Sequence, residues 1–422
     1  MDIIANYGNV LLILAIVFGT FMAWGIGAND VANAMGTSVG SGAVTIKQAI
    51  IIAVIFEFAG AILAGGEVTA TIRKGILDAQ LFTNDPHLLV YGMMASLLAA
   101  GSWLLIASSL GWPVSTTHSI VGAIVGFGAV GVGIDAVAWS KVFQIIISWI
   151  ASPVLAGIIS FALFRSLQNL IIDTQDPFHN SKKYVPYYMF LVGFVVSLVT
   201  IFKGLKHVGL SFSTSSSYLL ALGFGLLVAI IGSLMIRKIQ LIPDENKDFS
   251  FASMERVFGV LMIITAAAMA FAHGSNDVAN AIGPLAAIYS VIESGGVIGS
   301  KSALPLWILL VGGVGIVVGL ITYGHKVIAT IGTGITQLTP SRGFAATLAA
   351  AATVVIASGT GIPVSTTQVL VGAVLGVGLA RGMAALDTRV INRIFLSWII
   401  TLPAGGFMSI LFFFALKGAF GA

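Results

Sequence analysis

The chain carries the stretch Gly27-Ala28-Asn29-Asp30-Val31-Ala32-Asn33-Ala34 and repeats it, about 250 residues later, as Gly274-Ser275-Asn276-Asp277-Val278-Ala279-Asn280-Ala281. Two further stretches return in the same order: Pro113-Val114-Ser115-Thr116-Thr117 as Pro363-Val364-Ser365-Thr366-Thr367, and Ser148-Trp149-Ile150 as Ser397-Trp398-Ile399. Three matches in one order at nearly one separation indicate a duplication. We therefore expect a first repeat half at 1–165, a second repeat half at 257–422, and between them a connecting insert, 166–256, with two spans.

The composition indicates which solvent surrounds this duplicated chain. Of its 422 residues, 58% are hydrophobic and 9% are charged, whereas soluble domains carry about 25% charged residues. So little charge cannot cover a water-facing surface, and lipid must surround most of the chain. The sequence therefore predicts an all-α, polytopic protein of the cell membrane (an inner or plasma membrane), with about 12 transmembrane or re-entrant segments. The net charge of +4 does not indicate nucleic acid, because the basic residues lie in short connections.

The apolar runs that predict these segments differ in kind. They lie at 9–28, 43–64, 88–110, 118–134, 142–165, 186–202, 217–236, 257–275, 304–322, 345–358, 367–380 and 394–416. The stretches near 101–133 and 345–380 are each interrupted by a cluster of Gly, Pro, Ser and Thr, which leaves each part short for a span of about 20 residues. Such stretches are typical of re-entrant hairpins, which are tolerated where protein or a cavity surrounds them.

Charge in the connections indicates how the two halves are oriented. No Lys or Arg precedes Lys47, so we expect the N-terminus outside, whereas the second half starts from a basic connection that ends at Arg256. The loop 135–141 carries one Lys, while its counterpart 381–393 carries three Arg. Both contrasts predict an inverted-topology repeat with its site between the halves, near the middle of the bilayer.

The Asn-Asp-x-x-Asn motif predicts a cation site. An ionised Asp at membrane depth costs about 2.5–3.5 kcal/mol on insertion scales. On a helix, Asn29, Asp30 and Asn33 fall on one arc of about 100°, which presents a carboxylate and two amide carbonyls in one direction. Such hard oxygen ligands suit a small hard cation. The alternative is a cluster of Asn and Asp hydrogen bonds that joins helices.

The Pro-Val-Ser-Thr-Thr motif predicts an anion site. Pro ends the preceding element, and Ser and Thr are preferred N-cap residues, so each copy is expected to begin a short helix at a hairpin tip. The start of a helix offers free backbone N–H groups and the positive end of the helix dipole. Two such tips would bind one tetrahedral oxyanion between them. Ordinary helix capping is the alternative, but capping needs one hydroxyl and each copy supplies three.

The two motifs together predict coupled transport. Neither motif contains Lys or Arg, and a phosphate dianion cannot enter a low-dielectric site without compensation. Cations bound nearby must supply the positive charge, so each ligand requires the other. The prediction is a secondary active symporter with no organic cofactor. An enzyme is not expected. The adjacent Thr117 and His118 are a candidate nucleophile and base, but the second half does not repeat the pair, because it has Gln368 in place of the histidine. A channel remains an alternative.

The paired motifs resemble the signature of the inorganic phosphate transporter (PiT) family over both halves. This resemblance implies symport of inorganic phosphate with sodium or protons by alternating access, an inverted-repeat fold, and a homodimer in the lipid bilayer. Sodium is our expectation; proton coupling and a sulfate permease remain alternatives. By this resemblance the sodium ligands are Asn29, Asp30, Asn33, Asn276, Asp277 and Asn280. The phosphate-binding residues are Ser115, Thr116, Thr117, Ser365, Thr366 and Thr367.

Two titratable residues break the symmetry of the repeat. Glu57 lies in an apolar run and has no charged counterpart in the second half, so we expect it to act as a structural partner. His118 stands where the second half has Gln368. The phosphate site is therefore not expected to be fully symmetric.

Overall fold

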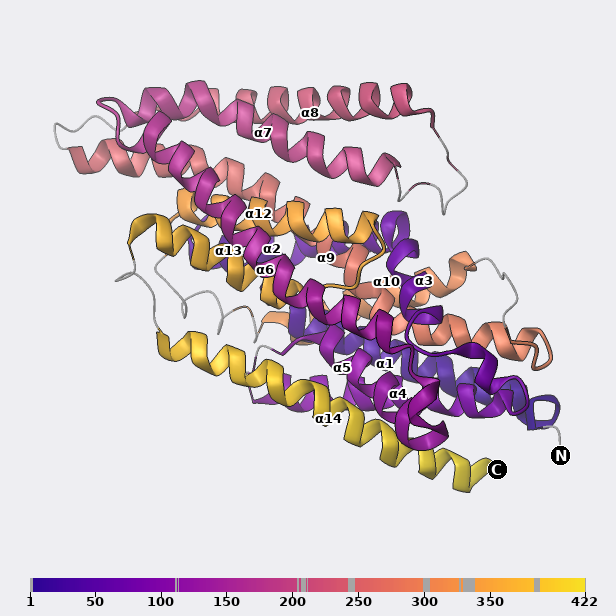
Figure 1. Cartoon of the computed structure of the whole chain (residues 1–422). Helices are drawn as coiled ribbons and strands as arrows, with labels where there is room; N and C mark the ends of the chain where they lie inside the picture. Colours follow the sequence, from indigo (N-terminus) through magenta and orange to yellow (C-terminus); the bar gives the residue numbers. More distant parts are fainter. Residues whose placement is uncertain are drawn as a thin grey trace.

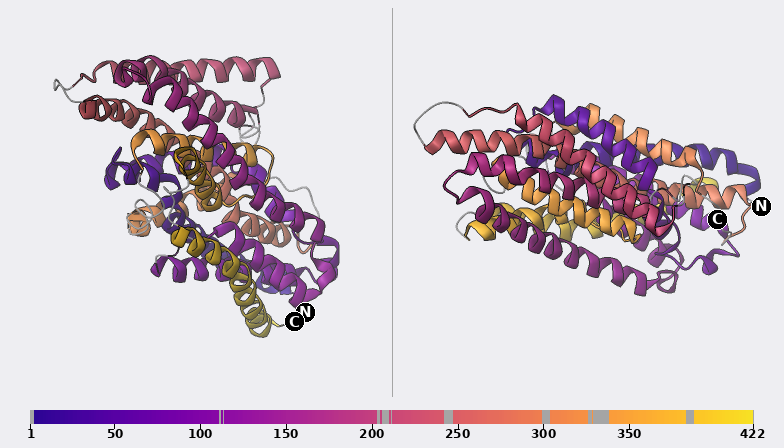
Figure 2. Two further views of the ribbon diagram at one scale, coloured as in Figure 1. Left: turned by 60° about the vertical axis from the view of Figure 1, so that its left-hand side comes forward. Right: turned by 90° about the horizontal axis from the view of Figure 1, so that it is seen from above.

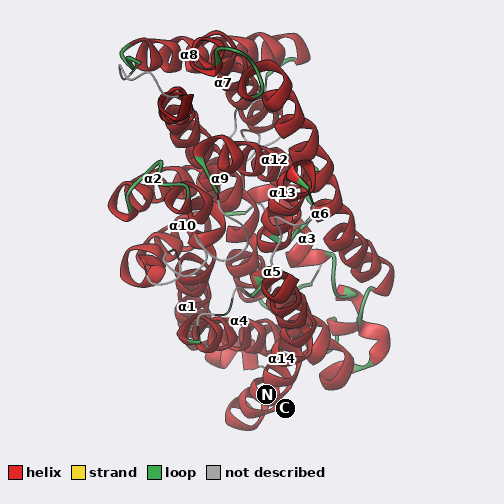
Figure 3. Ribbon diagram, turned by 90° about the vertical axis from the view of Figure 1, so that its left-hand side faces the viewer, coloured by secondary structure: helices red, strands yellow, loops and turns green. Residues whose placement is uncertain are grey.

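The computed structural model describes residues 3–110, 112, 114–202, 205, 210, 212–241, 247–298, 304–325, 328, 338–382 and 388–421. In these ranges every regular element is helical except one isolated bridge between Leu77 and Val137 (Figure 3). Ten of the helices found there are long and apolar enough to cross a membrane. The expectation of an all-α, polytopic membrane protein is confirmed. Pro113, part of the connection after 203, and residues 383–387 of the basic loop lie outside the described residues.

The helices follow the order of the predicted segments. Residues 3–167 form α1 (Ile3–Gly40), α2 (Ile46–Ala64), α3 (Gly66–Lys74), α4 (Pro86–Ser109), α5 (Thr116–Phe127) and α6 (Trp139–Leu167). Next come α7 (Pro177–Phe202) and α8 (Thr214–Arg237). The remainder forms α9 (Lys247–Glu293), α10 (Leu306–Gly319), α12 (Pro340–Gly359), α13 (Thr366–Arg381) and α14 (Thr388–Phe420). Short π-helical turns, η2 (Gly128–Val132), η4 (Gln168–Ile172) and η6 (Leu320–Gly324), extend α5, α6 and α10.

The two helices that carry the Asn-Asp motifs are much longer than the sequence predicts. The apolar runs predict spans that end at 28 and 275, but α1 continues to Gly40 and α9 to Glu293. Both Asn-Asp motifs therefore lie inside long helices. No break is needed there, because the polar side chains find hydrogen-bond partners on neighbouring helices and leave the backbone ladder intact. Helix α3 has no counterpart among the predicted segments.

The helices form an elongated bundle (Figure 1). Helices α7 and α8 pack against each other and lie along one edge, at the top of the view, while α14 borders the opposite edge. Figure 2 shows both chain termini at one end of the bundle. Accordingly, the rings of Tyr7 and Phe420 lie 5.7 Å apart, and the Tyr91 hydroxyl donates to the carbonyl of Gly421.

Two hairpins enter this bundle from opposite ends. Helix α4 begins at the end that holds the termini, as the Tyr91 contact shows, and returns through α5. Helix α12 begins at the other end, where Glu255 accepts hydrogen bonds from the backbone and side chain of Ser341, and it returns through α13. Helices α4 and α12 are long enough to cross a membrane, so the expectation that every part is short is wrong for these two arms. Helices α5 and α13 are the short arms.

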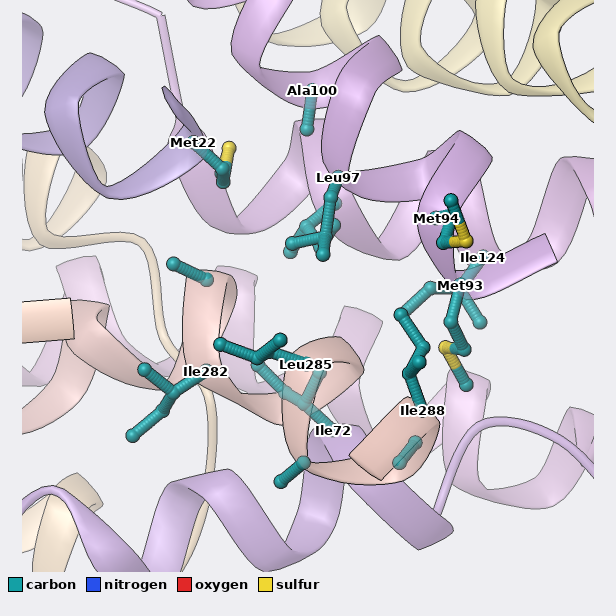
Figure 4. Close-up of a cluster of buried hydrophobic side chains, with 14 of the residues drawn as sticks. Met22, Ile72, Met93, Met94, Leu97, Ala100, Ile124, Ile282, Leu285 and Ile288 are labelled. Carbon is teal, nitrogen blue, oxygen red and sulfur yellow. The ribbon is translucent and has the colours of Figure 1, made fainter. Parts of the chain in front are cut away.

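The buried apolar side chains form two large clusters, and α1 and α9 each belong to both. The first cluster takes α1 residues up to Ile26 and α9 residues from Val278 onward. The second takes α1 residues from Val31 and α9 residues up to Ala272. Figure 4 shows part of the first cluster, where side chains from α1, α3, α4, α5 and α9 pack together. The Asn-Asp motifs lie where α1 and α9 pass from one cluster to the other.

Glycines bring helix pairs into backbone contact on both sides of this region. A Cβ added at Gly27 of α1 would lie 1.9 Å from the carbonyl oxygen of Ile316 on α10. A Cβ added at Gly274 of α9 would lie 2.1 Å from the carbonyl oxygen of Glu57 on α2. The contact between α1 and α10 therefore matches the contact between α9 and α2, and it pairs Ile316 with Glu57 as equivalent positions.

Candidate functional site

The repeated hydroxyl motifs form the first turns of α5 and α13. Ser115 is the N-cap of α5 and its hydroxyl accepts a hydrogen bond from the backbone of His118 at 3.2 Å; Ser365 does the same for Gln368 at 3.3 Å. The first backbone N–H groups of a helix lack partners inside the helix. Capping uses the third of these groups, so the N–H groups of the two Thr residues in each motif remain at the tips. The predicted half-helix start is confirmed in both copies.

The two tips touch each other. The Thr117 hydroxyl donates to the carbonyl of Val364 at 2.9 Å, and the Thr367 hydroxyl donates to the carbonyl of Val114 at 3.3 Å. Each motif thus bonds to the backbone of the other motif. The expected meeting of the tips between the halves is present.

Each tip is also tied to the aspartate of its own half. The Thr116 hydroxyl donates to Oδ2 of Asp30 at 2.7 Å, and the Thr366 hydroxyl donates to Oδ2 of Asp277 at 2.8 Å. Both carboxylates are fully buried. A buried carboxylate needs hydrogen bonds or a counter-charge, and the threonines supply part of that need.

The second asparagine of each motif reaches the tip of the other half. Asn33 donates to Thr367 at 2.7 Å, and Asn280 donates to Thr117 at 3.2 Å. The same amides lie 3.3 Å from the aspartate one turn earlier on their own helix. Oδ1 of Asn280 is a buried acceptor without a hydrogen-bond partner. Such an oxygen is available to a cation.

The first asparagine of each motif holds a hairpin in place. Asn29 donates to the hydroxyl of Ser108 at 2.8 Å, and Asn276 donates to the hydroxyl of Ser358 at 3.1 Å. Oδ1 of Asn276 also accepts from the backbone of Val364. The structure thus brings the twelve predicted residues to one place, where the aspartates, the second asparagines and the threonines share one network. The two first asparagines bind the ends of α4 and α12.

A fully buried histidine lies beside the two aspartates. His273 Nε2 is 3.0 Å from Oδ2 of Asp277 and 4.0 Å from Oδ2 of Asp30. Its other ring nitrogen, Nδ1, is 3.3 Å from the Glu57 carboxylate, which is also fully buried. Three carboxyl groups and one imidazole therefore share the centre of the bundle.

Sequence reasoning missed His273, although two signals were present. His273 precedes Asp277 by one helical turn, so both side chains lie on one face of α9. It also interrupts the repeat, because the first copy has Ile26 at the same place. Since Glu57 pairs with Ile316 in the packing, the Glu57–His273 pair of one side corresponds to two buried isoleucines on the other.

His118 lies away from this cluster. Its ring packs on Trp149 with centroids 3.9 Å apart. With Gln368 it lines one wall of an apolar groove of about 830 Å³ between α6, α13 and α14. His118 therefore faces away from the aspartates, and its ring does not belong to the carboxylate cluster.

In the described part of the chain, ten membrane-long helices surround a duplicated, buried polar site, which is the architecture of a multi-pass membrane protein. The model of the phosphate transporter family matches residues 26–409. The chain belongs to this family, and the family and fold are those of a transporter.

Comparisons with individual proteins point to the same family. A putative phosphate permease of Haemophilus influenzae is 55% identical over 420 residues, and the match covers 100% of both chains. The chloroplastic inorganic phosphate transporter 2-1 of Arabidopsis thaliana is 41% identical, over 96% of this chain and 72% of the plant protein. A solved structure titled "The sodium-dependent phosphate transporter" superimposes with a TM-score of 0.89 at 41% identity, over 97% of this chain and 99% of that chain. The predicted family is confirmed.

Proposed function

We propose that this protein is a secondary active symporter that carries inorganic phosphate together with sodium ions by alternating access. The observation that carries the proposal is the single hydrogen-bonded network between the Asn-Asp motifs and the Ser-Thr-Thr tips of both halves. Its two key links are the bond from Thr116 to Asp30 and the bond from Thr366 to Asp277. A solved relative at 41% identity is titled as sodium-dependent, which supports the choice of cation.

Sodium would bind to oxygen atoms at the aspartates. The proposed ligands come from Asn29, Asp30, Asn33, Asn276, Asp277 and Asn280. Asp30 and Asp277 supply the charge, and the unpartnered Oδ1 of Asn280 supplies a neutral ligand. Sodium there would relieve the repulsion between two buried carboxylates.

Phosphate would bind where the two tips meet. The donors would be the free backbone N–H groups at the starts of α5 and α13 and the hydroxyls of Ser115, Thr116, Thr117, Ser365, Thr366 and Thr367. Two of these hydroxyls, those of Thr117 and Thr367, now donate to carbonyls of the opposite tip, so they would turn toward the anion when it enters. Phosphate binding would therefore break the hydrogen bonds that now hold the two tips together.

Alternating access would follow from the position of the site between the two apolar clusters. Because α1 and α9 pass from one cluster to the other at the motifs, relative movement of the two packed bodies would open the site to one end of the bundle or to the other. The opposed entry of the two hairpins supports an inverted repeat of residues 1–165 and 257–422, joined by the insert 166–256.

The charge at the helix ends supports an orientation in the cell membrane. One end of the bundle holds basic residues at the termini of α2, α6, α8, α12 and α13: Lys47, Arg165, Arg237, Arg342 and Arg381. By the positive-inside rule this end is cytoplasmic, and the N-terminus, at the other end, is outside. In the lipid bilayer we expect a homodimer, as the family resemblance implies.

Proton coupling is the alternative with a specific observation behind it. His273 and Glu57 are buried titratable groups next to Asp277. Purified protein in liposomes distinguishes the two drivers. At one fixed pH on both sides, uptake of radiolabelled phosphate should require an inward sodium gradient and should fail with choline. Uptake driven equally well by a proton gradient without sodium would contradict the proposal, and full inhibition by equimolar sulfate would contradict the choice of anion.

A further inference from the structure

We propose that Asp30, His273 and Asp277 form a binding site for one divalent transition-metal ion, such as Co²⁺, Ni²⁺ or Zn²⁺, and that this ion excludes sodium from the two aspartates. The metal site itself is independent of the proposed function. Only the competition with sodium rests on it.

The distances between the ligand atoms suit such an ion. His273 Nε2 lies 3.0 Å from Asp277 Oδ2 and 4.0 Å from Asp30 Oδ2, and the ligand atoms of all three residues lie within 4.8 Å of one another. A tetrahedral ion with nitrogen and oxygen ligands at about 2.0–2.2 Å holds these ligands about 3.4 Å apart. The observed separations bracket this value, so small side-chain movements complete the site.

The donor types favour a transition metal over an alkali ion. Sodium, magnesium and calcium are bound by oxygen, whereas imidazole nitrogen suits zinc, copper, iron and nickel. The two aspartates carry two negative charges in a fully buried position. A single divalent ion neutralises both charges at once, while sodium needs two ions for the same effect.

Glu57 completes the site from the far side of the imidazole. Its carboxylate lies 3.3 Å from Nδ1 of His273. Histidines that bind metals usually present their second ring nitrogen to a carboxylate or carbonyl, which orients the ring and makes it a better ligand. The ring nitrogens of His273 and the carboxylate oxygens of Glu57 are buried without a hydrogen bond of acceptable geometry. Nε2 faces Oδ2 of Asp277 at 3.0 Å, and a metal ion between the two atoms would replace this contact by a bond to each of them.

The repeat predicts one such site per chain. At the equivalent places of the other half, Ile26 replaces His273 and Ile316 replaces Glu57, and both isoleucines are buried. An isoleucine offers no ligand atom. The two aspartates are related by the repeat, but the nitrogen ligand comes from one side only.

Metal binding to the purified protein in detergent tests the proposal without any transport. Co²⁺ is titrated into sodium-free buffer, and its visible absorption and binding isotherm are recorded for the wild type, His273→Asn, Glu57→Gln and His118→Asn. His118 is the matched control, because it is also a buried histidine but packs on Trp149. Wild type and His118→Asn should bind one Co²⁺ per chain. His273→Asn should lose this binding, and Glu57→Gln should weaken it about 10–100-fold.

Three outcomes would overturn the metal site. The first is that the wild type shows no saturable Co²⁺ binding. The second is that the wild type and His273→Asn bind Co²⁺ with equal affinity. The third is that only His118→Asn loses the binding. Glu57→Gln keeps the proposal testable if His273→Asn does not fold, as judged by size-exclusion chromatography, because it retains all three ligands.

A sodium titration separates this proposal from the proposed function. In the presence of Co²⁺, sodium should lower the apparent Co²⁺ affinity progressively as its concentration rises, and choline should have no effect. If Co²⁺ binds through His273 but sodium does not displace it, the exclusion of sodium proposed here is overturned, and sodium-driven uptake then tests the proposed function by itself. Absence of Co²⁺ binding together with intact sodium-driven uptake would refute the metal site alone.

Discussion

The hydroxyl of Thr116 donates a hydrogen bond of 2.7 Å to Oδ2 of Asp30, and this bond joins a hairpin tip to a proposed cation ligand. Thr366 and Asp277 repeat the relationship at 2.8 Å. The groups proposed to hold phosphate and the groups proposed to hold sodium are therefore direct neighbours. A change in one of them alters the surroundings of the other, which is the physical requirement for coupling.

Replacement of Thr116 by Val should therefore affect both substrates. Val keeps the shape of Thr but removes the hydrogen bond to a charged group, which is worth about 1.5–3 kcal/mol. We expect the apparent affinities for phosphate and for sodium to fall together, each by roughly 10-fold or more. Uptake measured over a range of both concentrations checks this, with Thr116→Ser as the control that keeps the hydroxyl. A loss of phosphate affinity with unchanged sodium activation would show that the two groups act independently.

Replacement of either central aspartate by asparagine should abolish sodium-stimulated uptake. The substitutions Asp30→Asn and Asp277→Asn each remove one negative charge and keep the size of the side chain. Without that charge the buried site no longer attracts a cation, and phosphate then lacks its counter-charge. The exposed Asp135 provides the control, Asp135→Asn, which should transport normally. Normal sodium stimulation in both central variants would remove the aspartates from the cation site.

The close helix contacts predict that alanine substitutions at two glycines will differ strongly in their effect on stability. A Cβ added at Gly60 would lie 2.1 Å from the carbonyl oxygen of Phe271, so Gly60→Ala must push α2 away from α9. Overpacking of this kind typically costs about 1–3 kcal/mol. Gly223 in α8 has open space, and Gly223→Ala should be neutral or slightly stabilising. Thermal unfolding in detergent compares the two, and an equal melting temperature for both variants would argue against the tight contact between α2 and α9.

The repeated motifs explain why much of the site could be predicted from the sequence. A duplicated Asn-Asp pair and a duplicated Ser-Thr-Thr group have few structural uses in an apolar chain, and both lie at the centre of the fold. The crossing of Asn33 to Thr367 could not be predicted, because it depends on which tip faces which long helix. The ends of α1 and α9 were not predicted either, for a related reason. The polar motif resembles the end of an apolar span, but its side chains are satisfied by tertiary contacts and α1 continues to Gly40.

His273 shows a different limit of sequence analysis. A single histidine in an apolar helix is usually a packed core residue, and its partner Glu57 lies more than 200 residues earlier, on α2. Only the fold brings the two side chains together. The sequence marks the position by the spacing of His273 from Asp277 and by the departure from the repeat at Ile26. The second signal gains its meaning when the packing identifies Ile316 as the counterpart of Glu57.

This correspondence predicts how stability responds to replacement of the Glu57–His273 pair. His273→Ile alone leaves the Glu57 carboxylate buried without its partner, and removal of one member of a buried pair costs about 3–5 kcal/mol. The double variant, Glu57→Ile with His273→Ile, copies the two isoleucines that the other half packs at the same places. Replacement of a whole buried pair by apolar residues is often neutral or stabilising by about 1–4 kcal/mol.

We therefore expect the double variant to unfold at a higher temperature than His273→Ile, because no carboxylate is left alone at position 57. Both variants lose the imidazole beside Asp277, so both should unfold below the wild type. Thermal unfolding of all four proteins in one detergent gives the interaction between the two positions as a double-mutant cycle. The reverse exchange, Ile26→His with Ile316→Glu, introduces the histidine–glutamate pair at the equivalent places of the other half. It is the matched control for the double variant. If the double variant is as unstable as the sum of the single variants, the two sides of the bundle do not pack alike and the equivalence of Glu57 with Ile316 is wrong.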